Sequence, residues 1–188
     1  MHAFAEPQHV WTFDDLLALP EDVDPRCYEI VDGSLVVSPA TTMWHEIVCD
    51  NIRRALRDAG EDAGFVAVGP VAIDMHPTYR IPDLVVVPTA VVRTNVNPVP
   101  ADRVALAVEV VSPGSRTTDR ITKPAQYCAA GIPAYWRVEY EPEVSLTAYR
   151  LEGDCYVEVG TWGRGQTAHV AVPFPVEVRI DAIAPPAR

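Results

Sequence analysis

Hydrophobic positions recur along this chain with two different periods. Residues 42–59 are apolar at every third or fourth position, which is the spacing of an amphipathic helix. Residues 12–19 predict a short helix with Thr12 as its cap, and residues 118–130 predict a third helix that ends at Gly131. Helices therefore account for three separate stretches of the chain.

Most of the remaining apolar runs are short and rich in β-branched residues. Residues 28–38 predict two strands joined at Asp32-Gly33, a dipeptide typical of tight hairpin turns. Three further strands are predicted at residues 65–69, 71–75 and 82–88. Residues 89–103 contain two prolines and two asparagines, and this composition predicts a loop.

The sequence VALAVEVVS, residues 104–112, is nearly all apolar, as in a central strand that is buried on both faces. Residues 134–140, 144–151 and 155–161 predict a C-terminal antiparallel meander. Strands and helices thus mix throughout the chain, so we expect an α/β fold with a mixed central sheet flanked by helices. We expect one domain over residues 1–188, with a core at about 12–180 and a loose tail at 184–188.

Composition narrows the function classes. Acidic residues outnumber basic ones 26 to 15, for a net charge of −11, which argues against a protein that coats nucleic acid but leaves room for a local basic groove. The four cysteines form no CxxC pair, so neither a zinc ribbon nor a thioredoxin site is indicated. The N-terminus has no signal-peptide pattern, and no apolar run approaches a membrane span. We therefore expect a cytoplasmic protein that does not bind membranes.

Glu109 is the most informative residue because a carboxylate inside a buried strand is costly unless it is paired or binds a metal. Asp83 begins another apolar strand. If the two strands are neighbours, two carboxylates converge, and a cation between them would relieve their repulsion. Mg²⁺ suits such oxygen ligands, with Mn²⁺ as its substitute. The alternative is that Glu109 forms an ion pair with Arg80 or Arg137.

Lys123 is the only lysine, against 14 arginines, which suggests a role that a compact ammonium fills better than a guanidinium. With Arg116, Arg120 and Asp119 it gives residues 112–123 a net charge of +2. Cations beside a pair of carboxylates match the needs of phosphodiester cleavage, in which a metal polarises the phosphate and a lysine stabilises developing charge. An ordinary solvated loop is the alternative.

Three weaker candidates complete the set. Glu29 is either a third acid of the site or a surface carboxylate, and His45 either approaches the site or serves as a cap or packing residue. His45 and Cys49 have the i, i+4 spacing of zinc ligands, but two ligands do not make a site. Gln126, three residues after Lys123, is a candidate for hydrogen bonding to the substrate.

Together, these elements resemble the Uma-two family of the PD-(D/E)XK restriction-endonuclease-like superfamily. The resemblance lies in the order and spacing of Pro82-Asp83, Glu109 to Pro113, Asp119-Arg120 with Lys123 and Tyr127, and Ala130 to Trp136. Tyr28-Glu29, Asp32-Gly33 and His45 also match its upstream pattern.

The resemblance implies a restriction-endonuclease-like fold. It also implies that Asp83, Glu109 and the Val110 carbonyl hold the metal. The superfamily's lysine usually lies two residues after the second acid, where this chain has Val111. The family's variant moves that lysine to the next helix, where Lys123 fits. Pro124 follows directly, so this helix must begin near Thr122 or bend there.

We therefore expect a Mg²⁺-dependent endonuclease. Asp83, Glu109, Lys123, Glu29 and His45 would be catalytic, and Arg116, Arg120 and Gln126 would contact nucleic acid, with DNA the first candidate. Cutting two strands needs two sites, so a homodimer is a further expectation. The alternative is a catalytically inactive binding or accessory module on the same fold.

Overall fold

The computed structural model describes residues 9–20, 24, 28–38, 40–112 and 118–186. The helical segments are α1 (Phe13–Leu17), α2 (Met43–Gly60), α3 (Thr89–Val92), η2 (Ala101–Arg103), η3 (Thr118–Thr122), α4 (Lys123–Ala129) and α5 (Ile180–Ile183). The first strands are β1 (Tyr28–Val31), β2 (Ser34–Val37), β3 (Phe65–Val68), β4 (Ile73–Met75), β5 (Thr78–Arg80), β6 (Leu84–Pro88) and β7 (Val99–Pro100). They are followed by β8 (Leu106–Val111), β9 (Ala134–Glu139), β10 (Ser145–Glu152), β11 (Cys155–Gly163), β12 (Thr167–Val170) and β13 (Val176–Arg179).

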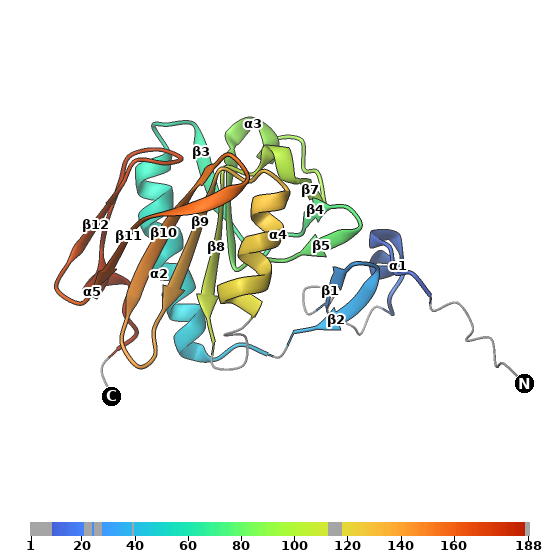
Figure 1. The fold of residues 1–188 in the computed structure, drawn as a ribbon, viewed down its shortest axis with the longest axis horizontal. Helices are drawn as coiled ribbons and strands as arrows, with labels where there is room; N and C mark the ends of the chain where they lie inside the picture. The colour runs from blue at the N-terminus through green and yellow to red at the C-terminus, as the bar shows by residue number, and fades with distance from the viewer. Residues whose placement is uncertain (1–8, 21–23, 25–27, 39, 113–117, 187–188) are drawn as a thin grey trace, which may run out of the picture.

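A mixed six-stranded sheet of order β11-β10-β9-β8-β6-β3 forms the centre of the fold. Strands β8 and β9 are parallel, whereas the other neighbouring pairs are antiparallel. Helices α2 and α4 lie on opposite faces of this sheet (Figure 1). This arrangement confirms the predicted α/β fold with a mixed central sheet and flanking helices.

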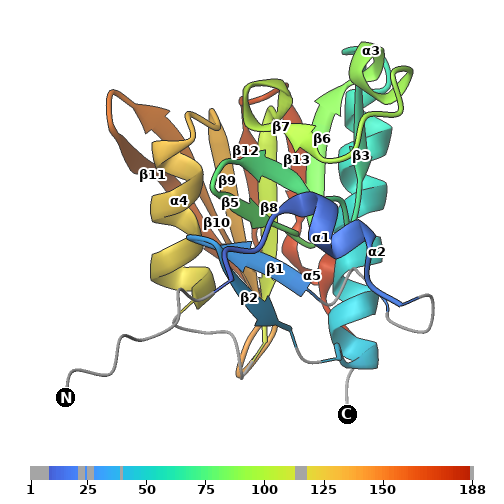
Figure 2. The ribbon, with the colours of Figure 1, turned by 90° about the vertical axis from the view of Figure 1, so that its right-hand side faces the viewer.

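A five-stranded sheet of order β2-β1-β5-β4-β7 lies beside the first sheet, and β12 and β13 form a separate pair. In Figure 2 the β1–β2 hairpin and α1 lie in front of the central strands, between α4 and α2. The predicted hairpin turn is present: Asp32 and Gly33 have φ angles of 49° and 75°, a left-handed conformation that glycine adopts at little cost.

Residues that alternate along the central strands fill two apolar cores. Leu84, Val86 and Val108 pack on the side of α2, with Ile52 and Leu56 of that helix. Val85, Val87 and Ala107 belong to the other cluster, with Tyr127 of α4. Because β8 is covered on both faces, all six of its residues are buried, as the nearly all-apolar run predicts.

Helix boundaries follow local sequence chemistry. Thr12 caps α1 in a reciprocal arrangement with Asp15, as predicted, and Thr42 caps α2 by accepting a hydrogen bond from the His45 amide. Pro124 lies in the first turn of α4, which begins at Lys123 and directly follows the π-helical turn η3. The sequence predicted either a helix start near Thr122 or a bend there, and the structure shows a change of helix type at this point.

Three parts of the secondary-structure prediction were wrong or incomplete. Residues 89–103 are not a plain loop, because they contain α3, β7 and η2. The predicted meander of β9, β10 and β11 is present, but β12, β13 and α5 follow it and were missed. Strand β5, only three residues long, was missed as well. In the described part of the chain, no helix is both long and apolar enough to cross a membrane.

Candidate metal-dependent active site

Asp83 and Glu109 come together because β6 and β8 are antiparallel neighbours. Leu84 pairs with Val108, and extending this register by one residue places Asp83 opposite Glu109. The Val110 amide donates a hydrogen bond of 2.7 Å to Asp83 Oδ2, which fixes this carboxylate against the end of β8. Both acids line one cavity of about 500 Å³, together with His45, Asp119 and Lys123.

Helix α4 supplies the partners of the buried Glu109 carboxylate. Lys123 Nζ lies 2.9 Å from Glu109 Oε2, and the Tyr127 hydroxyl donates a bond of 2.6 Å to Oε1. Lys123 Nζ also lies 3.5 Å from Asp119 Oδ1 and 3.7 Å from Glu29 Oε1. The lysine therefore lies among three carboxylates, and the predicted alternative of a Glu109 pair with Arg80 or Arg137 is not what the geometry shows.

Glu29 is buried at the site and is not a surface carboxylate. Its Oε2 accepts a bond of 2.9 Å from Arg80 Nη1, and its Oε1 accepts one of 2.8 Å from the Ile81 amide. Arg80 Nε donates in turn to Gln126 Oε1, at 2.8 Å. Through these bonds β1, β5 and α4 are joined around Lys123.

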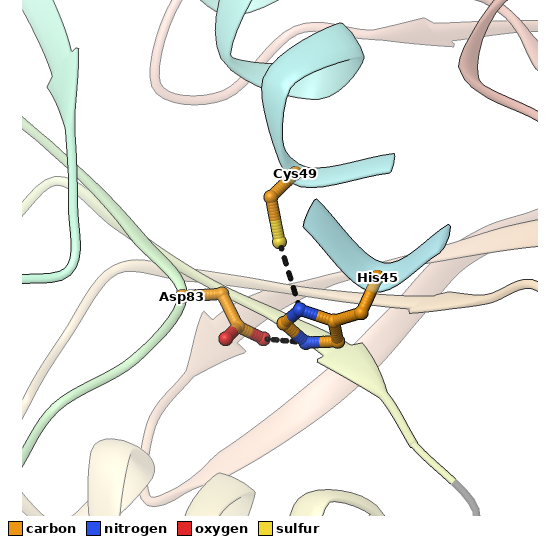
Figure 3. Close-up of side chains that lie close together, drawn as sticks. All are labelled: His45, Cys49 and Asp83. Atoms are coloured by element: carbon orange, nitrogen blue, oxygen red, sulfur yellow. Dashed lines mark hydrogen bonds and ion pairs between the residues drawn. The ribbon is translucent and has the colours of Figure 1, made fainter. Parts of the chain in front are cut away.

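His45 lies between Cys49 and Asp83 (Figure 3). Its Nε2 is 3.3 Å from Asp83 Oδ2, and its Nδ1 is 3.6 Å from Cys49 Sγ. Burial lowers the pKa of His45, but hydrogen bonding and charge attraction by Asp83, with help from Glu46 and the Val110 backbone, outweigh it and raise the pKa. His45 thus does reach the site, and α2 presents it there from its first turn.

The pKa shifts show that the site carries an excess of negative charge. Burial and the charges of Asp83, Asp119 and Glu29 raise the pKa of Glu109, even though Lys123 opposes the shift. Burial disfavours the Lys123 cation, but Glu109, Glu29 and Asp119 attract it and raise its pKa. Both shifts have the same electrostatic origin, which is a concentration of carboxylates in a poorly solvated place.

Counting charges shows what would neutralise the site. Glu29, Glu109 and Asp119 are buried, and Asp83 joins them as a partly exposed fourth acid. Arg80 and Lys123 are the buried permanent cations among the described residues. Among the described residues, acids thus outnumber buried cations at this site, and a bound divalent ion would add positive charge there. Oxygen donors facing a water-accessible cavity fit Mg²⁺ or Mn²⁺ by chemistry as well as by charge.

The three residues predicted to contact nucleic acid lie in different places relative to the site. Arg116 lies outside the described residues. Arg120 is largely exposed and pairs with Glu139 on β9, and the Gln126 side-chain oxygen accepts the bond from Arg80. Neither Arg120 nor Gln126 lines the cavity that holds the two acids, so any role in nucleic-acid binding would lie at its periphery.

Sequence reasoning missed three contributors to the site. Tyr127 was noted only as part of a motif, Asp119 only as part of that motif and as a negative charge, and Arg80 only as a partner for Glu109. The i, i+4 spacing of Asp119 and Lys123 places both on one face of a helix, so that signal was available. The Glu29–Arg80 pair joins residues 51 positions apart, and the sequence carries no comparable signal for it.

Comparison with known proteins is consistent with this geometry. A solved structure titled "Crystal structure of a putative nuclease belonging to DUF820 from Anabaena variabilis ATCC 29413" is similar in fold, with a TM-score of 0.68. It is 17% identical, and the match covers 92% of this chain and 97% of that one. No curated protein matches the chain. The profile of the Uma2 family, described as "Putative restriction endonuclease", matches residues 13–182, nearly the whole chain, and the protein therefore belongs to the Uma2 family.

Proposed function

We propose that this protein is a Mg²⁺-dependent nuclease that hydrolyses phosphodiester bonds, with DNA as the first substrate to test. The observation that carries the proposal is the arrangement of the acids: Asp83 and Glu109 line one cavity of about 500 Å³, with the Lys123 ammonium 2.9 Å from Glu109. A divalent ion between the two acids would relieve their repulsion. Membership of the Uma2 family supports the same activity.

Asp83 and Glu109 would hold the ion, and the Val110 carbonyl is the third proposed ligand. Bound there, Mg²⁺ would polarise the scissile phosphate and lower the pKa of a water molecule. The protein's own contribution is to hold these ligands rigidly. The Val110 amide orients Asp83, and Tyr127 and Lys123 hold the two oxygens of Glu109.

Lys123 would orient the attacking water and stabilise negative charge that develops on the phosphate. Its ammonium is nearly buried, lines the cavity and is held by Glu109, Asp119 and Glu29. Because these carboxylates keep the amine protonated, Lys123 would act as a fixed positive charge and not as a proton acceptor. Glu29 would act through Lys123, as a positioning residue.

Cleavage of labelled DNA and RNA tests the proposal with Mg²⁺, with Mn²⁺ and with EDTA. We expect metal-dependent cleavage that Glu109→Gln abolishes and that Lys123→Ala lowers about 100-fold or more. Glu177→Gln is the matched control because this acid is on the exposed face of β13. If the wild type cleaves neither DNA nor RNA, or cleaves them as fast in EDTA as with Mg²⁺, the proposal is wrong.

A binding or accessory module without catalysis is the second candidate, and the net charge of −11 favours it, since such a chain repels free nucleic acid. Calorimetry with Mn²⁺ separates the two candidates. If the protein is a nuclease, the wild type should bind Mn²⁺ and the Asp83→Ala variant should not. An inert module should give the same heats of titration for the wild type and the variant. Co-purification of a basic protein would point to an accessory role.

A further inference from the structure

We propose that His45, Cys49 and Asp83 form a second metal site, selective for zinc and similar thiolate-binding ions, that competes with the Mg²⁺ site for Asp83. One ligand atom from each of the three residues lies within 4.8 Å of the other two. His45 and Cys49 are separated by one turn of α2, and Asp83 faces them from the start of β6 (Figure 3).

The chemistry of these donors differs from that of the Mg²⁺ site. Imidazole nitrogen, thiolate sulfur and a carboxylate oxygen are ligands that Zn²⁺ accepts, with a fourth position left for water. Mg²⁺ prefers oxygen donors alone. The two sites share Asp83, so an ion held by Cys49 would occupy an acid that the proposed nuclease reaction needs. This competition rests on the proposed function, whereas the metal site itself does not.

Binding would require the His45 ring to reorient. His45 Nε2 faces Asp83 and Nδ1 faces Cys49, so the ring must turn until one nitrogen points between the sulfur and the carboxylate. All three side chains line the 500 Å³ cavity, which provides room and a path for the ion. Glu46 Oε1, 3.6 Å from Nδ1, adds negative charge nearby.

The thiol would bind as a thiolate. Burial, Asp83 and Glu46 raise the pKa of Cys49, so without an ion the residue stays protonated and hydrogen-bonds to His45. On binding, the S–H proton passes to solvent and a metal–sulfur bond forms, with no change in oxidation state. A coordinated thiol is deprotonated by the ion's charge.

Cobalt spectroscopy tests this site without reference to catalysis. Co²⁺ added to the wild-type protein, with a phosphine reductant to keep thiols reduced, should produce a thiolate-to-cobalt charge-transfer band at one equivalent. Cys49→Ser and Cys49→Ala should lose the band. A variant with serine at the other three cysteines, Cys27, Cys128 and Cys155, should keep it. Absence of the band in the wild type, or its persistence in both Cys49 variants, would overturn the proposal.

The competition has its own readout. In Mg²⁺-supported cleavage, Zn²⁺ should inhibit the wild type, and Cys49→Ser should need at least ~10-fold more Zn²⁺ for the same inhibition, since loss of a ligand costs at least as much affinity as loss of an outer-shell partner. Equal inhibition of the wild type and Cys49→Ser would contradict the competition for Asp83. The cobalt experiment would then decide alone whether the second metal site exists. If the protein has no nuclease activity, the proposed function is wrong, and the cobalt experiment still tests the second metal site.

Discussion

At the scale of single residues, the site depends on how Glu109 is held. A buried carboxylate needs partners for both oxygens, and Lys123 and Tyr127 supply them from one helix. From the sequence, the unusual charge inside a buried strand predicted a role for Glu109, and the count of one lysine predicted a role for Lys123; the structure places these two side chains in contact. Tyr127 could not be distinguished from the core tyrosines, because its function depends on where its hydroxyl points.

Removing that hydroxyl should weaken both folding and metal binding. Tyr127→Phe leaves Glu109 Oε1 without its donor, and an unsatisfied buried acceptor costs about 1–3 kcal/mol of unfolding free energy. Urea denaturation measures this loss, and Mn²⁺ calorimetry should show weaker binding in the same variant.

Tyr156→Phe is the matched control, because that hydroxyl donates 2.9 Å to the Ile132 carbonyl, away from the site. It should lose stability but keep its Mn²⁺ affinity. A Tyr127→Phe protein with unchanged Mn²⁺ affinity would show that Tyr127 is a core residue only.

At the scale of elements, the sequence predicted well those segments whose signal is local. The hairpin turn, the long amphipathic helix and the all-buried strand each carry their pattern within a few residues. Strands β5 and β7 have only three and two residues; β5 pairs with the neighbouring β4 and with β1, and β7 pairs with β4. A period of two cannot be recognised over such lengths, so the second sheet was not predictable as a whole.

The boundary between η3 and α4 determines how Pro124 affects the helix. The π-helical turn η3 ends where α4 begins, and the Asp119 carbonyl accepts a bond of 2.6 Å from the Tyr135 hydroxyl. Pro124 has no amide hydrogen to donate to the Asp119 carbonyl, five residues earlier in the chain. The Tyr135 hydroxyl of β9 donates to that carbonyl instead. This arrangement lets the chain place Lys123 directly before a proline.

We therefore expect Pro124→Ala to change the unfolding free energy by less than about 1 kcal/mol, since the Asp119 carbonyl that an amide at this position would serve already accepts a bond from the Tyr135 hydroxyl. Ala129→Pro, on an exposed position at the other end of α4, should cost ~3 kcal/mol or more, because it removes a bond and clashes with the preceding turn. Thermal and urea denaturation of both variants test this contrast. A large loss in Pro124→Ala would show that the proline itself stabilises the bend.

At the scale of the whole molecule, charge is the dominant feature. The net charge of −11 predicts that nucleic acid is attracted, if at all, only locally or after a metal has bound. The same excess of acid at the site links metal binding to protonation. In the metal-free protein, burial and the neighbouring acids raise the pKa of Glu109 well above its usual range, so a proton and a metal ion compete for this carboxylate.

This linkage predicts a pH dependence with a definite sign. A carboxyl whose pKa is higher in the folded than in the unfolded state contributes stability below its unfolded pKa and loses it as pH rises through the folded pKa. In EDTA, the unfolding free energy of the wild type relative to Glu109→Gln should therefore fall as pH rises above the ordinary glutamate pKa of about 4.3.

Saturating Mg²⁺ should reverse this slope, because the ion binds the deprotonated carboxylate. Denaturant melts over a pH series measure both slopes. A difference between wild type and Glu109→Gln that does not vary with pH in EDTA would mean that Glu109 is ionised throughout.

The central claim is that Asp83 and Glu109 hold one divalent ion beside Lys123, and anomalous X-ray scattering from crystals grown with Mn²⁺ tests it most directly. We predict a single strong peak bonded to both carboxylates, at about 2.1–2.3 Å from their oxygens, with the Lys123 ammonium next to it. An empty site at saturating Mn²⁺, or a peak bound only to acids elsewhere on the molecule, would contradict the account.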